Sequence, residues 1–470
     1  MSQISVVILG AGPAGLSAGY ELAKKGVAVN IVEKDSIVGG ISRTVEHNGF
    51  RFDIGGHRFF TKMDRVNKLW DEILGDEFLT RPRISRIYYN HKFFDYPLKI
   101  SNTFKNLGPI KSFEFFLSYL GSKIQPYPRE DNLEQWVSNR FGRKLYRAFF
   151  KTYTEKVWNI PCDQIEAEWA AQRIKGLSFS SAVRAALLGN SNGKIKSLID
   201  EFKYPRLGPG QMYETMAEKI REIGGKMIMN TRVTKLTKTD NTLASVEVTD
   251  SDGTTQTLTA DHILSSIPLT ELVQIIDDSV PDHVCRAAEK LSYRSLLTIN
   301  LMMNRPESFP DTWIYIHSPK VKVGRVQCFK NWSPHMVPDS DQSSLGLEYF
   351  CTEGDSLWNA ADADLVELGK NEIAQLELAD PTTVFDAFVI RTPKTYPVYM
   401  ANYREHLAAI KDYVTPITNL QCIGRNGMFK YNNMDHSILT GLLAADNILG
   451  ADNDLWTVNT ETAYHEQTEN

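Results

Sequence analysis

The sequence contains little cysteine, and what it has is scattered. The five cysteines are Cys162, Cys285, Cys328, Cys351 and Cys422. They form no C-x-x-C pair and are odd in number, so neither a disulfide framework nor a zinc site is expected. We therefore predict no metal site and a reducing compartment, the cytoplasm.

Long apolar runs and a basic surplus are also missing. No stretch approaches the about 20 apolar residues of a membrane span, and the apolar residues 4–9 lack the basic flank of a signal peptide. The chain has 52 Lys and Arg against 57 Asp and Glu, a formal net charge of -5. No overall basic field is therefore expected to attract nucleic acid or an anionic bilayer. With 470 residues, 42% of them hydrophobic, the composition is that of a globular protein of two or three domains.

The first 33 residues contain a nucleotide-binding pattern. Residues 6–9 are a continuous apolar run, typical of a parallel strand covered on both faces. Glycine-rich residues 10–15 follow at once, and residues 14–24 have apolar positions at helical spacing. A second apolar run, residues 27–32, ends in Glu33. This order of strand, glycine turn, helix, strand and acid predicts a dinucleotide-binding βαβ unit.

Each conspicuous residue of this unit has a physical role. Gly10 permits the tight turn, Gly12 lets the backbone approach a pyrophosphate, and Gly15 lets helix and strand pack closely. The helix N-terminus supplies free N–H groups and the positive end of its dipole to the phosphates. We expect Glu33 to accept a hydrogen bond from a ribose hydroxyl.

The next residues indicate which dinucleotide binds. Glu33 is followed six residues later by Gly39-Gly40, and then by Arg43. This arrangement resembles the FAD-binding amine-oxidase and protoporphyrinogen-oxidase superfamily. Gly55-Gly56 forms a further glycine turn, where that superfamily brings the backbone close to the isoalloxazine ring. The resemblance implies that the cofactor is FAD.

The expected fold class is α/β. We predict a Rossmann-like FAD-binding domain of the glutathione-reductase type with a parallel sheet, an inserted helical domain and an antiparallel-sheet substrate domain. Val233 is expected near the adenine, and strands are expected over residues 296–303, 313–317, 325–329 and 345–350. The predicted boundaries are 1–65, 205–275 and 415–450 for a discontinuous FAD domain, 66–204 for the helical insertion, 276–414 for the substrate domain and 451–470 for a polar tail.

Further segments resemble a narrower family, the UDP-galactopyranose mutases and especially their eukaryotic branch. Residues 156–161, followed by 168–173, are similar to the segment by which those enzymes present an arginine to the substrate diphosphate. Other similar segments occur in the same order in this chain. They lie around His57, Tyr315, Arg325 to Pro334, Tyr396-Pro397, Gly424-Arg425 and Tyr431 to Asp435.

The mutase resemblance implies a reaction without net redox change, in which reduced flavin N5 attacks the anomeric carbon and displaces the nucleotide diphosphate. Reduction is expected from NAD(P)H. The resemblance implies that Arg173 and Arg325 hold the diphosphate, because guanidinium groups bind phosphates bidentately. It further assigns Tyr315 and Tyr396 as phosphate donors and His57 to the flavin. Gly424, Arg425 and Asp435 would contact FAD, and Tyr96, Lys99, Trp158 and Asn331 the substrate.

Each assignment has a structural alternative. The arginines could form surface ion pairs, the tyrosines could be core residues, His57 could be a hydrogen-bonded turn residue, and Asp435 could cap a helix. The family also has a Tyr-Pro-Phe-Gln stretch near the nucleobase, whereas this chain has Tyr96-Pro97-Leu98-Lys99. This difference leaves open another nucleotide sugar, or a related phosphorylated glycan precursor, as the substrate.

The main functional alternative is a true oxidoreductase. The superfamily includes oxidases and desaturases that transfer hydride to FAD, and residues 104–124 could form their membrane-facing surface. Gly108-Pro109 interrupts that segment, and its aromatic residues are expected in the core, so contact with a membrane is not predicted. A flavin-binding protein without catalysis is the third alternative. The preferred prediction is an FAD-dependent sugar-nucleotide mutase of cell-surface polysaccharide biosynthesis that takes a small nucleotide sugar.

Overall fold

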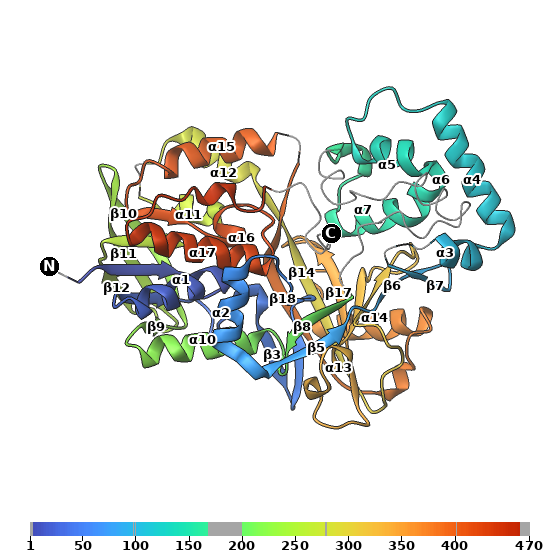
Figure 1. The fold of residues 1–470 in the computed structure, drawn as a ribbon, viewed down its shortest axis with the longest axis horizontal. Helices are drawn as coiled ribbons and strands as arrows, with labels where there is room; N and C mark the ends of the chain where they lie inside the picture. The colour runs from blue at the N-terminus through green and yellow to red at the C-terminus, as the bar shows by residue number, and fades with distance from the viewer. Residues whose placement is uncertain are drawn as a thin grey trace.

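The computed structural model has the predicted α/β fold, with one parallel sheet and several antiparallel sheets (Figure 1). Helices and strands far apart in the sequence lie side by side in it. The residues it describes are 3–96, 98, 100–167, 200–277, 280–400 and 402–460.

A five-stranded sheet in the order β19-β13-β1-β2-β9 carries the predicted βαβ unit. All its strand pairs are parallel. The central strand is fully buried from Val6 to Leu9, which explains its unbroken apolar run. The strands are β1 (Ser5–Leu9), β2 (Ala28–Val32), β9 (Lys226–Ile228), β13 (His262–Ser265) and β19 (Leu420–Cys422).

Helix α1 (Pro13–Lys24) packs against α17 (Met434–Ile448) and α10 (Gly210–Glu222). Small residues make this close packing possible. A Cβ atom at Gly441 of α17 would lie 2.2 Å from the Ala14 carbonyl oxygen of α1, and one at Gly15 would lie 2.0 Å from the Gly10 carbonyl oxygen in the turn before α1. The C-terminal helix is thereby held against the first helix of the chain.

Three small antiparallel sheets surround this layer. One is three-stranded and the other two are strand pairs. They comprise β10 (Thr231–Thr239), β11 (Thr242–Asp250) and β12 (Thr255–Leu258); β3 (Thr44–His47) and β4 (Phe50–Asp53); and β5 (Phe78–Pro82) and β8 (Glu201–Pro205).

A seven-stranded sheet in the order β18-β14-β17-β16-β15-β6-β7 forms the second main layer. Its pairs are antiparallel except β15 with β6. All four strands predicted for this sheet are present. Its members are β6 (Ser85–Tyr89), β7 (Lys92–Asp95), β14 (Ser292–Met303), β15 (Trp313–Ile316), β16 (Arg325–Cys328), β17 (Ser343–Cys351) and β18 (Val384–Val398).

Several helices lie together beyond β6 and β7, at the upper right of Figure 1. They are α3 (Ile100–Leu107), α4 (Pro109–Ile124), α5 (Leu133–Phe141), α6 (Arg143–Tyr146) and α7 (Thr152–Trp158). The expectation that the aromatic residues of this segment are core is wrong for Phe113, which is 61% exposed. Among the described helices, none is long and apolar enough to cross a membrane.

The remaining described helices connect or cover these layers. Helix α15 lies along the upper edge of the part that contains the parallel sheet (Figure 1). They are α2 (Asp64–Leu74), α11 (Leu269–Ile275), α12 (Asp282–Lys290), α13 (Phe329–Trp332), α14 (Asp362–Gln375), α15 (Tyr403–Val414) and α16 (Gly424–Gly427).

Candidate active site

The glycine turn before α1 has the geometry of a phosphate cradle. Gly10 has φ +99°, and its N–H donates to the Val32 carbonyl at 2.8 Å. Gly12 is different, because its φ of -81° is open to any residue. A Cβ atom at Gly12 would meet only the Cα of Gly40, at 4.0 Å. Neither backbone strain nor packing within the protein requires a glycine at position 12. A ligand that approaches the helix N-terminus closely would require one.

Glu33 ends β2 beside this turn. Its carboxylate accepts hydrogen bonds from the N–H groups of Ala11 at 2.7 Å and Asp35 at 3.1 Å. Burial raises the pKa of the Glu33 carboxyl above its ordinary value, although both donors oppose the shift. The N–H of Thr231 donates to the Glu33 carbonyl, so β10, which carries Val233, begins next to this acid.

The second glycine pair lies against the first turn. The N–H of Gly39 donates to the Ala11 carbonyl at 2.8 Å, and both Gly39 and Gly40 have positive φ, +97° and +55°. Arg43 forms an ion pair with Asp35 at 2.8 Å. The two glycine loops therefore lie against each other at the N-terminus of α1, and these residues fit FAD.

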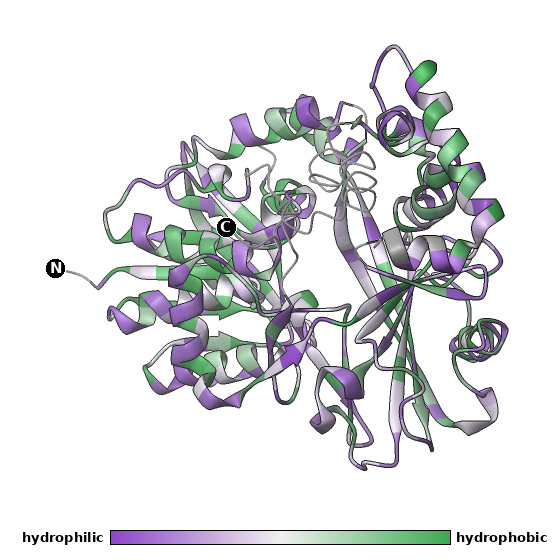
Figure 2. Ribbon diagram, turned by 45° about the vertical axis from the view of Figure 1, so that its right-hand side comes forward, coloured by the Kyte–Doolittle hydropathy of each residue, from purple (hydrophilic) through white to green (hydrophobic). Residues whose placement is uncertain are grey.

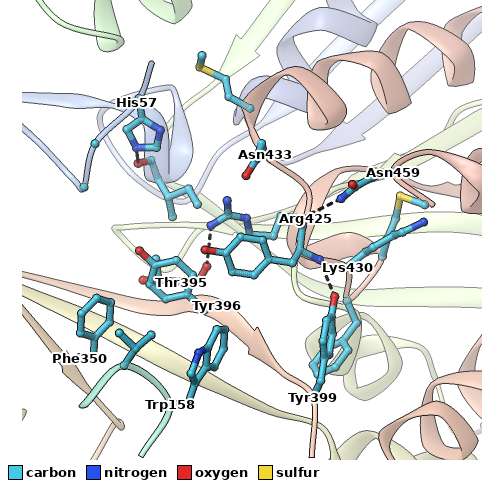
Figure 3. A pocket seen from close by; sticks show the side chains of 18 of the residues that line it. His57, Trp158, Phe350, Thr395, Tyr396, Tyr399, Arg425, Lys430, Asn433 and Asn459 are labelled. Carbon is cyan, nitrogen blue, oxygen red and sulfur yellow. Dashed lines mark hydrogen bonds between the residues drawn. The ribbon is translucent and has the colours of Figure 1, made fainter. Parts of the chain in front are cut away.

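A cavity of about 930 Å³ lies between the parallel-sheet part and the seven-stranded sheet (Figure 3). It brings together most of the residues assigned to flavin chemistry and substrate. Those that line it are Gly55, Gly56, His57, Tyr96, Trp158, Tyr315, Arg325, Tyr396, Arg425 and Asp435.

Three assigned residues are not found there. Arg173 and Lys99 lie outside the described residues. Asn331 does not line the cavity, and its side-chain amide donates to the carbonyls of Phe309 at 2.7 Å and Asp311 at 2.8 Å. These bonds connect two loop carbonyls to α13, so Asn331 has a structural role here.

His57 is held by the backbone in the cavity wall formed with Gly55 and Gly56. Its Nε2 lies 2.9 Å from the carbonyl oxygens of both Ile41 and Ile54, so Nε2 carries the proton. Burial lowers the pKa of the imidazole to about 4, and the charges of Arg425 and Arg325 act in the same direction. His57 is therefore neutral at pH 7.

Arg325 on β16 faces the same cavity from the antiparallel sheet. Its Nε donates to Glu348 at 2.7 Å, and its Nη2 donates to the Tyr396 hydroxyl at 3.1 Å. Burial opposes its charge, but the Glu348 carboxylate holds the pKa of this guanidinium well above its usual value. Burial also raises the pKa of Tyr315 and Tyr396, so both phenols remain donors.

Arg425 lies where α16 begins, opposite Tyr396 (Figure 3). Its Nε donates to the Asn432 carbonyl at 2.8 Å and its Nη1 to the Thr395 carbonyl at 3.2 Å. Its guanidinium lies 4.8 Å from the ring centroid of Tyr431. These contacts fix a cation at the junction between β18 and the helices that return to the parallel sheet.

Asp435 lies in the first turn of α17, and one of its oxygens accepts from Thr61 Oγ1 at 2.7 Å. Gly424 has φ +78°, and a Cβ atom there would lie 3.1 Å from the Ala14 Cβ. This glycine therefore lets α16 approach α1. Asp435 thus lines the cavity and Gly424 contacts the first helix, and the resemblance assigns both residues to FAD.

Several cavity residues had not been predicted. Tyr153 lies 5.5 Å from Tyr315 between ring centroids, and Arg58 lies 4.0 Å from the ring centroid of Trp313. Glu348, which pairs with Arg325, gave one sequence signal: it is the only charged residue in the apolar run 343–351. A lone acid in a buried strand indicates a partner on the next strand.

The charge of the lining is strongly positive. Six of its described residues are cationic and one, Asp435, is a carboxylate. The cations are Arg58, Arg325, Arg404, Lys411, Arg425 and Lys430. A cavity of this kind favours an anionic ligand over an amine or a hydrocarbon.

Comparison with known proteins agrees with the cradle and the cavity. The sequence model of flavin-containing amine oxidoreductases matches residues 13–449. The chain belongs to this family. Membership identifies a flavin enzyme and supports FAD as its cofactor, as the glycine pattern predicted.

The fold is also similar to that of a solved structure over the whole chain. A crystal structure of reduced UDP-galactopyranose mutase superimposes with a TM-score of 0.84, covering 99% of this chain and 100% of the other at 22% identity. A probable UDP-galactopyranose mutase from Klebsiella pneumoniae is 26% identical over 36% of this chain and 44% of its own length.

Carotenoid desaturases are similar as well. A 4,4'-diapophytoene desaturase from Methylomonas is 35% identical over 18% of each chain. A phytoene desaturase from Phycomyces blakesleeanus is 23% identical over 53% of this chain and 47% of its own. The chain thus spans less than half the length of these curated relatives, and the choice between mutase and oxidoreductase depends on the site.

Proposed function

We propose that this flavoprotein is a sugar-nucleotide mutase, which interconverts the pyranose and furanose rings of a nucleotide-linked sugar. The observation that carries the proposal is the cationic lining of the cavity, which has six positive side chains against the Asp435 carboxylate in the lining and the Glu348 carboxylate paired with Arg325. A nucleotide diphosphate brings the negative charge that such a lining stabilises. The fold of a reduced UDP-galactopyranose mutase supports the same substrate class.

The chain's own residues would hold FAD in two places. The cradle of Gly10, Gly12 and Gly15 with Glu33 would take the ADP half, and Gly55, Gly56 and Asp435 would take the flavin half. Bound and reduced, FAD supplies a nucleophilic nitrogen to the anomeric carbon without net redox change. We propose NAD(P)H as the reductant.

Arg325 would bind the diphosphate that leaves and returns. A leaving group that carries developing charge is stabilised by fixed donors that need no reorganisation. Glu348 fixes the Arg325 guanidinium through Nε, and Tyr396 accepts from Nη2, so the donors are oriented before a ligand arrives. Tyr315 and Tyr153 add phenol groups on the same wall, and Arg173 is proposed as the second clamp.

His57 would act through its position and not through proton transfer. Its Nε2–H is engaged by the Ile41 and Ile54 carbonyls, which leaves Nδ1 as an acceptor. A neutral imidazole also adds no further positive charge to the flavin-side wall. It would therefore hold the Gly55-Gly56 turn in place beside the flavin.

The nucleoside would lie toward Tyr96, whose ring centroid is 4.7 Å from that of Tyr315. The sequence there departs from the Tyr-Pro-Phe-Gln stretch of the eukaryotic mutases, so the binding experiment compares sugars linked to UDP and to dTDP. We place the product in cell-surface polysaccharide biosynthesis.

The second candidate is an oxidoreductase that transfers hydride to FAD, because desaturases are among the relatives. A polyene has no charge to place against six cations, and an amine would be repelled by them. An oxidase with an acidic substrate would satisfy the same charges. Only the redox balance of turnover separates that oxidase from a mutase.

Substrate binding tests the part of the proposal that concerns a nucleotide-sugar ligand and Arg325. Reduced protein is titrated anaerobically with UDP- and dTDP-hexoses while the flavin spectrum is followed. We expect saturable binding that Arg325→Lys weakens at least about tenfold, since a lysine lacks the planar guanidinium that Glu348 and Tyr396 orient toward the cavity. Arg221→Lys, an exposed arginine on α10, is the matched control and should bind as wild type. Equal binding by wild type and Arg325→Lys would contradict the role of Arg325.

A further inference from the structure

Helix α4 presents an unusual apolar surface to solvent. Five of its large hydrophobic side chains are exposed, by 39% to 80% of their surface. Figure 2 shows the helix at the outer edge of the molecule with hydrophobic segments along it. The five residues are Ile110, Phe113, Leu117, Leu120 and Ile124, here called the α4 stripe.

The spacing of the stripe places it on one side of the helix. Successive members are three or four residues apart, which aligns them along about four turns. The opposite side is packed: Ser112 and Ser122 are buried, and a Cβ atom at Gly142 would lie 2.9 Å from the Tyr119 backbone. The helix is thus anchored through these small residues and through Phe115, which packs against the core, whereas the five residues of the stripe remain exposed.

The charge around the stripe differs from that of the chain. Residues 105–151 contain nine basic and four acidic side chains, whereas the whole chain has a net charge of -5. Two of the acids are paired within this part, Glu114 with Lys144 at 2.7 Å and Glu130 with Arg140 at 2.7 Å. Lys105 and Lys111 are exposed on α3 and α4 themselves.

We propose that the α4 stripe docks on an anionic phospholipid surface, with the stripe in the interface and the surrounding lysines and arginines against the headgroups. Apolar side chains on one face of a helix, flanked by cations, are the combination that binds such surfaces. The local basic surplus complements the negative leaflet, although the chain as a whole does not. This inference is independent of the proposed reaction, and it replaces the expectation from the sequence that residues 104–124 do not contact a membrane.

A second copy of the chain fits the stripe less well. A two-fold pairing of α4 centred on Leu117 would bring Lys111 of one copy toward Lys123 of the other at both ends. It would also bring two basic lobes together, and like charges across an interface are costly. A stable dimer buries about 800 Å² and some 20 to 30 residues on each side, whereas the stripe has five residues.

Vesicle flotation with the full-length holoprotein tests the docking. Vesicles of phosphatidylcholine alone are compared with vesicles containing about 30% phosphatidylglycerol at about 0.1 M salt. We expect flotation only with the anionic vesicles. Phe113→Ser/Leu117→Ser should weaken it at least about tenfold, because two apolar side chains no longer enter the interface. Lys105→Gln/Lys111→Gln should weaken it severalfold and reduce its salt dependence.

The matched control is Phe385→Ser on β18, a phenylalanine that is 53% exposed but lies on another element. It should float as wild type does, and flavin content and thermal unfolding confirm that each variant is folded. Failure of the wild type to float with anionic vesicles would overturn the proposal. So would a wild-type dimer that Phe113→Ser/Leu117→Ser converts to monomers without vesicle binding, since the stripe would then be a protein interface.

Discussion

Arg325 and Glu348 form a buried ion pair on adjacent strands of the seven-stranded sheet, where they are register partners on β16 and β17. The Glu348 side chain is 1% exposed and that of Arg325 is 16% exposed. The other carboxylate oxygen of Glu348 accepts from Gln327 Nε2 at 2.7 Å. The cation proposed for the substrate is therefore already compensated, so its role is that of an oriented donor more than of a free charge.

This pairing predicts that Arg325→Ala damages stability as well as binding. The variant leaves the Glu348 carboxylate buried without its cation, which costs about 3–5 kcal/mol of unfolding free energy. Arg325→Met/Glu348→Gln removes both charges and should recover most of that loss without restoring substrate binding. Urea unfolding of the three proteins gives the comparison. Equal stability of wild type and Arg325→Ala would show that the pair is not desolvated.

His57 predicts a specific pH dependence. Its pKa is about 4 in the folded protein and near 6.5 when unfolded, so the unfolded state binds the proton more readily. The stability that the neutral imidazole confers is present above pH 6.5 and is lost as the pH falls toward 4. The loss amounts to as much as about 3 kcal/mol.

The unfolding free energy of the wild type is measured against that of His57→Gln at each pH. This reference removes the contribution of other groups that titrate in the same range. The difference in unfolding free energy between wild type and variant should shrink steadily from pH 7 to pH 4. A difference that does not change with pH would mean that His57 titrates normally.

Gly12→Val should yield folded protein that does not retain FAD. The new side chain would enter space in which the protein offers only the Gly40 Cα at 4.0 Å, so it would exclude a ligand and not disturb the fold. Gly121→Val, where a Cβ atom meets nothing within 4 Å on exposed α4, is the matched control and should remain yellow. Flavin absorbance per protein is the measurement, and a fully yellow Gly12→Val would refute the cradle assignment.

Asn331→Ala should lower stability and leave substrate affinity unchanged. Its amide satisfies the carbonyls of Phe309 and Asp311, and their loss costs about 1–3 kcal/mol. Thermal unfolding and the anaerobic titration together test this. Weakened substrate binding at unchanged stability would contradict the structural role and would support the assignment of Asn331 to the substrate site.

The sequence predicted the fold well where local patterns decide the structure. The βαβ unit up to Glu33 combines strand, turn and helix signals within 33 residues, and the structure confirms the α/β fold. The sequence did not predict that β6 and β7 extend the seven-stranded sheet. They join it where β6 pairs with β15, and this pairing links segments more than 200 residues apart. Periodicity carries no information about such partners.

The site shows the same division. His57, Arg325, Tyr396 and Arg425 were assigned from motifs, and they converge on one cavity. Glu348 and Tyr153 were missed, because each matters through a partner from another element. The exposure of Phe113 was missed as well. An aromatic residue in a helix is expected in the core, and only the packing partners of that helix show whether it is buried.

The most direct test of the mutase proposal is the redox balance of turnover. Protein is reduced with dithionite under anaerobic conditions and given UDP- and dTDP-hexoses, with product ring size followed by chromatography. We predict many turnovers for each reduced flavin, no further reductant consumed and no turnover with oxidised flavin. Product formed instead by the protein with oxidised flavin, in proportion to the flavin that becomes reduced and with oxygen needed for further turnover, would contradict a mutase and establish an oxidoreductase.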